Sequence, residues 1–151
     1  NPVQIMKLVE VIKTDHTDQA VFDAAYNWVE HIGKVAVTCR DTPGFIVNRL
    51  LIPSLMQAIL MLERGDASCR DIDISMQLGA GHPMGPLTLA DYVGLDTCYY
   101  IIEGWCTKFP DEPAFDLPAI LKAKVDAGDL GRKTGKGFYH WDGDKRGDPV
   151  E

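Results

Sequence analysis

The spacing of apolar residues along the chain changes from strand-like to helical near residue 41. Before that point, two short apolar runs at residues 5–12 and 34–39 have the length and the β-branched content of buried strands. The segment between these runs repeats its apolar residues every three to four positions, which predicts a helix with Thr17 as its N-cap. The order of strand, helix and strand predicts a βαβ unit.

A parallel pair of strands with a single helix leaves one face of its sheet uncovered, whereas parallel sheets occur almost only with both faces covered. We therefore interpret residues 1–41 as the last piece of a larger α/β domain. Strand character stops at residues 40–43, where a long helix is expected to begin. The chain opens with Asn1 and without a Met, so we also expect it to start in the middle of a longer protein.

The longest helical pattern runs from Thr42 to Gly65. Thr42 is a suitable N-cap, Pro43 suits the first helical position, and Gly65 supplies a left-handed stop. Apolar residues surround almost the whole helix, so we expect neighbouring elements or a second copy of the chain to bury it. Asn48 is the conspicuous polar exception near its start. Pro53 lacks an N–H group and predicts a kink just after this polar turn.

Helical spacing continues through most of the remaining chain. Ser68 and Asp71 resemble a capping box at the start of one of these helices. The further helices are expected over residues 68–78, 87–93, 96–108 and 118–128. A glycine-rich turn at residues 131–137 precedes aromatic residues, and residues 142–151 are expected to be frayed. The predicted fold is mainly α, with a helical domain over residues 42–151 preceded by a terminal βαβ piece.

The composition is that of an ordinary globular protein, with 46% hydrophobic and 25% charged residues. A formal net charge of −7 argues against a nucleic-acid surface, which needs clustered Lys and Arg; an acidic surface kept for solubility is the plain alternative. Polar residues interrupt the longest helix, so we expect no membrane span. The four cysteines form no C-x-x-C pair and are expected to be reduced, and no residues have the spacing of metal ligands.

Two polar residues in apolar surroundings are the candidates for chemistry. Glu10 lies inside an apolar strand, where an uncompensated carboxylate is costly, so it needs a cationic or hydrogen-bonding partner. The alternatives are an acid at the end of the strand that reaches solvent or pairs with Lys7. Asn48 either serves a site or bonds to nearby backbone. His82, in a Gly/Pro-rich connector, is the one histidine considered near a site, and the residues alone give neither a complete catalytic set nor a nucleotide fingerprint.

Five segments, in this order along the chain, carry a resemblance to a known family. They are Asn1-Pro2-Val3 with residues 6–12, then residues 41–49, 81–86, 91–96 and 133–139. Together they resemble the C-terminal portion of the L-3-hydroxyacyl-CoA dehydrogenases. The match covers nearly the whole chain, and five motifs at similar spacing make it specific.

The resemblance implies both a fold and a reaction. In that family a Rossmann domain binds NAD, and a helical domain of the 6-phosphogluconate-dehydrogenase type supplies the dimer contact and part of the substrate cleft. Residues 1–41 would then end the NAD-binding domain, and residues 42–151 would form the helical dimerisation and substrate domain. The implied reaction is the oxidation of L-3-hydroxyacyl-CoA to 3-ketoacyl-CoA with NAD in fatty-acid β-oxidation. A 3-hydroxybutyryl-CoA dehydrogenase is the alternative, and the mitochondrial matrix is the expected compartment, with the cytoplasm as the other choice.

The resemblance also implies roles for individual residues. Glu10 matches the acid that pairs with the catalytic histidine, and Asn48 matches a polar residue near that histidine and the acyl end of the substrate. Asn1 matches a residue on the nicotinamide side of NAD, and Lys133 matches a cofactor contact, with a solvated charge as its alternative. The catalytic histidine lies in a His-Phe-Phe-Asn-Pro motif, of which this sequence holds only Asn1 and Pro2. We therefore expect the 151 residues alone to be inactive, and the rival interpretation is a helical homodimer that binds neither NAD nor substrate productively.

Overall fold

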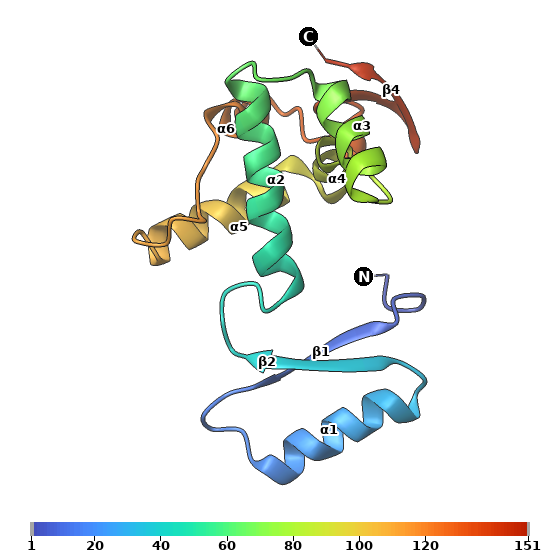
Figure 1. Ribbon diagram of the computed structural model, residues 1–151, viewed down its shortest axis with the longest axis vertical. Coiled ribbons are helices and arrows are strands. Elements are labelled where there is room, and N and C mark those ends of the chain that lie inside the picture. The colour runs from blue at the N-terminus through green and yellow to red at the C-terminus, as the bar shows by residue number, and fades with distance from the viewer. Residues whose placement is uncertain (1, 151) are drawn as a thin grey trace. The chain divides into compact units, whose positions relative to one another are not determined.

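The computed structural model describes residues 2–150 and divides the chain into two compact units, Asn1–Leu50 and Leu51–Glu151 (Figure 1). The first unit contains β1 (Leu8–Lys13), α1 (Gln19–His31) and β2 (Val35–Arg40). β1 and β2 pair in parallel along their whole length. The predicted βαβ unit is thus confirmed.

One face of this strand pair is covered by α1. Alternate strand residues, including Val11 and Ala36, pack against Val29 and the partly buried ring of Phe22 on the helix. Successive side chains of a strand point to opposite faces, so Glu10 belongs to the face that α1 does not cover.

Two boundaries of the first unit differ from the prediction. β1 begins only at Leu8, because the residues before it form a turn in which the N–H of Met6 donates to the carbonyl of Pro2 at 3.0 Å. α1 is capped by Asp18 instead of Thr17, since Oδ1 of Asp18 accepts a backbone N–H of the first helical turn at 2.8 Å. Both residues are suitable caps by type, and the sequence therefore did not decide between them.

The second unit is built mainly from helices, which confirms the predicted mainly α fold. α2 (Val47–Glu63) starts in the first unit and continues into the second. The other elements are α3 (Cys69–Ala80), α4 (Pro86–Val93), α5 (Leu95–Lys108), α6 (Ala119–Asp126), the 3₁₀ turn η1 (Arg132–Thr134), β3 (Tyr139–Asp142) and β4 (Lys145–Pro149). Their core contains Leu55, Ile59, Leu87, Ile102 and Leu121, each 2% exposed or less. The predicted capping box is confirmed, because the Ser68 hydroxyl accepts the N–H of Asp71 at 3.1 Å.

The start of α2 was predicted too early. The helix begins at Val47, so Thr42 does not cap it and Pro43 does not open it. Residues 43–46 form turns, in which Gly44 and Phe45 have left-handed backbone with φ of 75° and 54°. This conformation is incompatible with a right-handed helix and is rare for a residue with a side chain such as Phe45. The helix continues through Pro53 to Glu63.

The predicted end of α2 is confirmed. Gly65 has φ 72°, and its N–H donates to the carbonyl of Leu62 at 3.0 Å. The N–H of Asp66 donates to the carbonyl of Met61 at 3.0 Å. These two bonds are those of a Schellman motif, which satisfies the last carbonyls of a helix.

The C-terminal residues are ordered strands, contrary to the predicted frayed end. β3 and β4 form an antiparallel hairpin with Asp142 opposite Lys145, and the turn places Gly143 at its first position with φ 58°. A two-residue turn with a leading glycine matches the twist of hairpin strands, a signal that was overlooked in this polar stretch. The N–H of Val150 also donates to the carbonyl of Phe138 at 2.9 Å.

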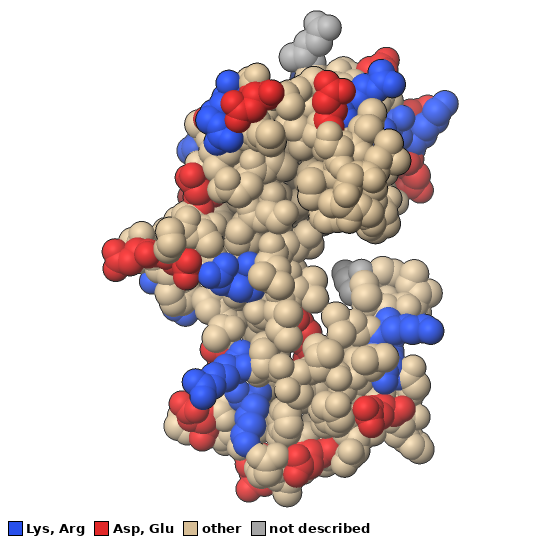
Figure 2. Space-filling view, viewed as in Figure 1, with Lys and Arg blue, Asp and Glu red and all other residues tan. Residues whose placement is uncertain are grey.

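The surface shows no separation of charge on the face in view in Figure 2, and the helices and cysteines bear on the predicted partners and thiols. On the face shown in Figure 2, blue and red side chains are interspersed. Within residues 2–150, no helix combines the length and the apolar character that a membrane span requires. The four cysteines are free thiols, and burial raises the pKa of Cys98 to about 12.

Candidate functional site

Glu10 binds the first turn of α2 through its carboxylate. Its Oε1 accepts the backbone N–H groups of Ile46 and Val47, at 3.0 and 2.9 Å. The predicted need for a hydrogen-bonding partner is therefore confirmed, and neither of the alternatives, free solvation or a pair with Lys7, describes this contact. Both bonds end on Oε1, and none of the described residues is hydrogen-bonded to Oε2.

The contact has a clear physical reason. The first N–H groups of a helix have no partner inside the helix, and the aligned peptide dipoles place partial positive charge at this end. A carboxylate there satisfies two N–H groups and meets favourable charge. Glu10 thus caps α2 from a strand more than thirty residues earlier in the chain. Rules that consider only neighbouring residues cannot predict such a cap.

Asn48 follows the capped residue Val47 directly. Its side chain is exposed, and no hydrogen bond from its amide to another described residue is present. The first turns of α2 are more exposed than predicted, with Val47 42% and Leu50 69% exposed. Asn48 is therefore free to meet a ligand or another segment, and the alternative of a bond to nearby backbone is not observed.

Lys133 lies in η1 and pairs with a carboxylate at the start of α5. Its Nζ is 2.6 Å from both carboxylate oxygens of Asp96. This hydrogen bond, more than the simple attraction of the charges, lowers the pKa of Asp96. Gly94 leaves room for the pair, because a Cβ there would lie 3.2 Å from Nζ of Lys133. The ammonium has three N–H donors, so one remains for a further acceptor when two bind Asp96.

The two remaining candidates fall elsewhere. Asn1 lies outside the described residues, so its predicted role as a cofactor contact stays a prediction. His82 is exposed in the connector between α3 and α4, and its backbone N–H donates to the carbonyl of Met76 at 3.1 Å. Glu10 and Asn48 are brought to the same helical turn within the first unit, and Lys133 belongs to the second unit.

Buried carboxylates in the second unit were missed by sequence reasoning. Asp91 is 1% exposed and accepts three N–H groups, from the backbone of Phe138 and Tyr139 and from the indole of Trp141, at 2.8 to 2.9 Å. Burial raises its pKa in spite of these donors. Asp91 thereby fixes the segment that follows Lys133.

Asp73 has a similar role at the start of α4. Its two oxygens accept the N–H groups of Leu87 and Thr88 at 2.8 and 3.0 Å, and the hydroxyl of Tyr139 at 2.9 Å. The residue at the N-cap of α4, Gly85, has no side chain and leaves the space that Asp73 occupies. The sequence gives no signal for this role, because Asp73 lies in a helical pattern in which an acid on the surface would look the same.

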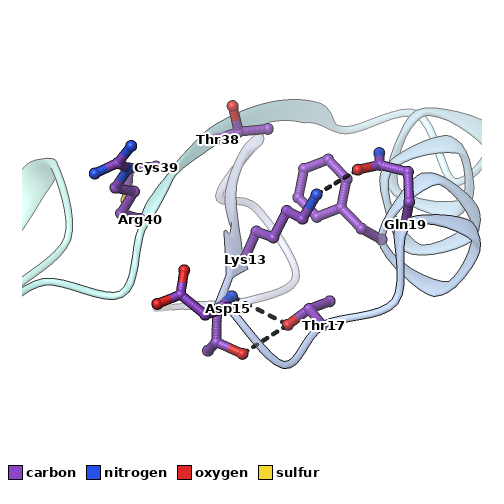
Figure 3. Close-up of a pocket in the computed structure, with 9 residues that line it drawn as sticks. Lys13, Asp15, Thr17, Gln19, Thr38, Cys39 and Arg40 are labelled. Carbon is purple, nitrogen blue, oxygen red and sulfur yellow. Dashed lines mark hydrogen bonds between the residues drawn. The ribbon is translucent and has the colours of Figure 1, made fainter.

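An open cavity of about 710 Å³ lies in the first unit, at the carboxyl ends of β1 and β2 (Figure 3). Lys13, Asp15, Gln19 and Arg40 are among its lining residues. The ammonium of Lys13 already bonds to the side chain of Gln19. None of the predicted site residues lines this cavity, so it is a separate feature from the Glu10 and Asn48 turn.

Comparison with known proteins places the chain in a family. Residues 1–42 match the model of the 3-hydroxyacyl-CoA dehydrogenase NAD-binding domain, and residues 44–141 match that of the 3-hydroxyacyl-CoA dehydrogenase C-terminal domain. The chain therefore belongs to the 3-hydroxyacyl-CoA dehydrogenase family, as the five motifs indicated.

Individual relatives agree with this assignment. The chain is 52% identical over 93% of its length to a probable 3-hydroxyacyl-CoA dehydrogenase of Caenorhabditis elegans, and 53% identical over the same share to the mitochondrial hydroxyacyl-coenzyme A dehydrogenase of Rattus norvegicus. A solved structure of the (S)-3-hydroxybutyryl-CoA dehydrogenase from Ralstonia eutropha matches 94% of the chain with a TM-score of 0.90 and 41% identity. The chain spans 46%, 45% and 50% of these three proteins, about half their length.

Proposed function

We propose that the protein to which this chain belongs oxidises L-3-hydroxyacyl-CoA to 3-ketoacyl-CoA with NAD, as a step of fatty-acid β-oxidation. The observation that carries this proposal is the consecutive match of both family domains, residues 1–42 and 44–141, to one chain. We propose residue 41 as the end of the NAD-binding domain and residues 42–151 as the helical domain. The gap between the two matched regions, at residue 43, supports this boundary.

Glu10 is proposed to act on the histidine of the motif expected before Asn1. Its Oε1 is engaged by α2, and its Oε2 has no hydrogen bond to a described residue. A carboxylate oxygen on one imidazole nitrogen fixes the tautomer of the ring and stabilises its cation. The other nitrogen can then take the proton of the substrate hydroxyl as a general base.

Asn48 and Lys133 are proposed to bind substrate and cofactor. NAD supplies the acceptor for the hydride that leaves the carbon bearing the hydroxyl. The exposed amide of Asn48 offers donors and an acceptor to the acyl end of the substrate. The ammonium of Lys133 keeps one N–H for the cofactor while Asp96 holds the other two. Asn1 is proposed to contact the nicotinamide side.

The reaction is tested in the full-length protein by following NADH formation with L-3-hydroxyacyl-CoA substrates. Glu10→Gln should lower kcat by roughly 10²–10⁴-fold, the range that general base catalysis contributes, because the histidine loses the carboxylate that stabilises its cation, and NAD affinity should stay unchanged within about two-fold. Glu30→Gln, at an exposed position of α1, is the matched control and should behave as wild type. A wild-type protein that forms no NADH contradicts the proposed reaction. Equal losses of turnover and NAD binding in Glu10→Gln would indicate a structural role instead.

A 3-hydroxybutyryl-CoA dehydrogenase is the second candidate, because the matched structure from Ralstonia eutropha bears that name. The same assay separates the two when the acyl chain is lengthened from four carbons upward. A preference for the four-carbon substrate favours the second candidate. The mitochondrial matrix is the proposed compartment, supported by the name of the Rattus norvegicus relative, and imaging of the full-length protein tests it.

A homodimer through the helical domain is also proposed. Met61 on α2 is 41% exposed, and it borders an apolar groove of about 270 Å³ lined also by Ile72 and Met76 of α3. A second copy of the chain would bury this surface. Met61→Lys should shift the full-length protein toward the monomer in sedimentation velocity at micromolar concentration. The matched control is Val21→Lys on α1, which is 63% exposed in the first unit; equal dissociation of both variants, or of neither, contradicts this interface.

A further inference from the structure

We infer that Glu10 is a positioning residue for Asn48, in addition to its proposed action on a histidine. Through its Oε1 the carboxylate fixes the first turn of α2, and this turn sets the place of the Asn48 amide. The inference rests on the proposed function. Glu10 would then have two separable roles: Oε1 caps α2, and Oε2 acts on the histidine.

The first turn of α2 has no cap of its own. The residue before the helix, Ile46, has an apolar side chain with no acceptor for an N–H group, and the chain reaches it through the left-handed backbone of Gly44 and Phe45. The hydroxyl of Thr42 points back to the carbonyl of Arg40, at 3.5 Å, and not forward to the helix. Glu10 accepts two of the N–H groups at this end of the helix, those of Ile46 and Val47, which have no partner inside the helix.

Asn48 depends on this turn for its position. It follows Val47, whose N–H is one of the two that Glu10 accepts. The side chain of Asn48 is exposed, and no hydrogen bond to another described residue holds it. The backbone bonds from Arg49 to the carbonyl of Gly44 and from Leu50 to that of Ile46 span Asn48 and close the turn, but neither of them reaches β1. The strand-borne carboxylate is therefore the contact that ties this end of α2 to β1.

The chemistry of residue 10 allows the two tasks to be separated. Glutamine has the same length as glutamate and keeps an acceptor oxygen, so Glu10→Gln retains the cap and loses the charge. Glu10→Ala loses both the cap and the charge. Glu10→Met fills nearly the same space without an acceptor, and it serves as a second cap-less variant if Glu10→Ala does not fold.

The experiment measures kcat and KM for L-3-hydroxyacyl-CoA in the full-length enzyme. Glu10→Gln should lower kcat and leave KM within about two-fold. The cap-less variants should lower kcat and also raise KM roughly five- to ten-fold, the scale of a lost helix cap. Asn48→Ala should raise KM on its own. In a cap-less variant, Asn48→Ala should raise KM little further, because the effects of residues that act through one another are not additive. In Glu10→Gln, Asn48→Ala should raise KM by its full amount.

A second measurement does not depend on turnover. Hydrogen exchange of the Ile46 and Val47 amides should be slow in wild type and Glu10→Gln, and more than about five-fold faster in Glu10→Ala or Glu10→Met. Glu30→Ala on α1 is the control and should leave the exchange rates of these two amides unchanged. Equal KM values in Glu10→Gln and the cap-less variants, or additive effects of Asn48→Ala in both backgrounds, would overturn the inference. A wild-type enzyme without dehydrogenase activity contradicts the proposed function instead, while the exchange pattern still tests the cap.

Discussion

Replacing Asp91 by asparagine should destabilise the helical unit strongly. Asp91 is 1% exposed and accepts three N–H groups, with Oδ1 facing Phe138 and Oδ2 facing both Tyr139 and Trp141. Asparagine has one acceptor oxygen, and its amide nitrogen is a donor. The best orientation keeps the oxygen at the position of Oδ2 and turns the NH₂ group toward the N–H of Phe138. Two donors then face each other in a buried site.

The magnitude follows from these three bonds. A hydrogen bond to a charged group contributes about 1.5–3 kcal/mol, and a neutral one about 0.5–1.5 kcal/mol. The substitution removes one charged bond and turns two others into neutral ones, a loss of roughly 3.5–6 kcal/mol. The carboxylate is costly to bury, as its raised pKa indicates, and the neutral amide recovers part of this cost. The net loss should be about 3 kcal/mol.

Urea unfolding followed by circular dichroism measures this loss. The midpoint should fall while the m-value stays constant, because the folded structure buries the same surface. Asp142→Asn, at an exposed position of the hairpin whose N–H groups Asp91 accepts, is the matched control and should change stability by less than about 0.5 kcal/mol. A loss below about 1 kcal/mol in Asp91→Asn would refute the reasoning.

Two further predictions concern the same unit. Gly85→Ala should cost about 2–4 kcal/mol in urea unfolding, because its Cβ would lie 2.3 Å from Cγ of Asp73 and displace the cap of α4. Gly79→Ala is the control, since a Cβ at this position in the last turn of α3 would have no atom within 4 Å, and it should be neutral or stabilise by about 0.5–1 kcal/mol. Equal effects of the two substitutions would refute this steric account. Lys133→Met should raise the pKa of Asp96 toward its usual value of 3.8 in an NMR titration. In wild type the stability from this pair is present above that value and is lost as pH falls through the lower native pKa. An unchanged pKa would show that Lys133 is not its cause.

Local rules predicted the elements of this fold well. The strand–helix–strand order, the capping box at Ser68 and the left-handed stop at Gly65 are each determined by a few neighbouring residues. Such features depend on backbone conformation and short-range hydrogen bonds, which are fixed by residue type. They could therefore be predicted without the tertiary structure.

Contacts between distant residues account for the errors. The start of α2 was misplaced because the cap is Glu10 on β1 and not the adjacent Thr42. Asp73 and Asp91 were missed because a buried carboxylate has the same sequence appearance as a surface acid on an amphipathic helix. Their partners become visible only when α4 and the C-terminal hairpin are placed together. The candidate site was predictable in part, since an acid within an apolar strand already indicated a specific partner for Glu10.

The contacts of Asp91 explain why the C-terminal turn at residues 131–137 is rich in glycine. A Cβ at Gly137 would lie 2.1 Å from Oδ1 of Asp91, and one at Gly131 would lie 2.3 Å from its backbone oxygen. Packing around a buried acid is thus sufficient to require those glycines. A related chain that had lost its chemistry but kept this fold would be under the same constraint. The glycines of this turn are therefore a marker of shared architecture, and evidence for function has to come from Glu10, Asn48 and Lys133.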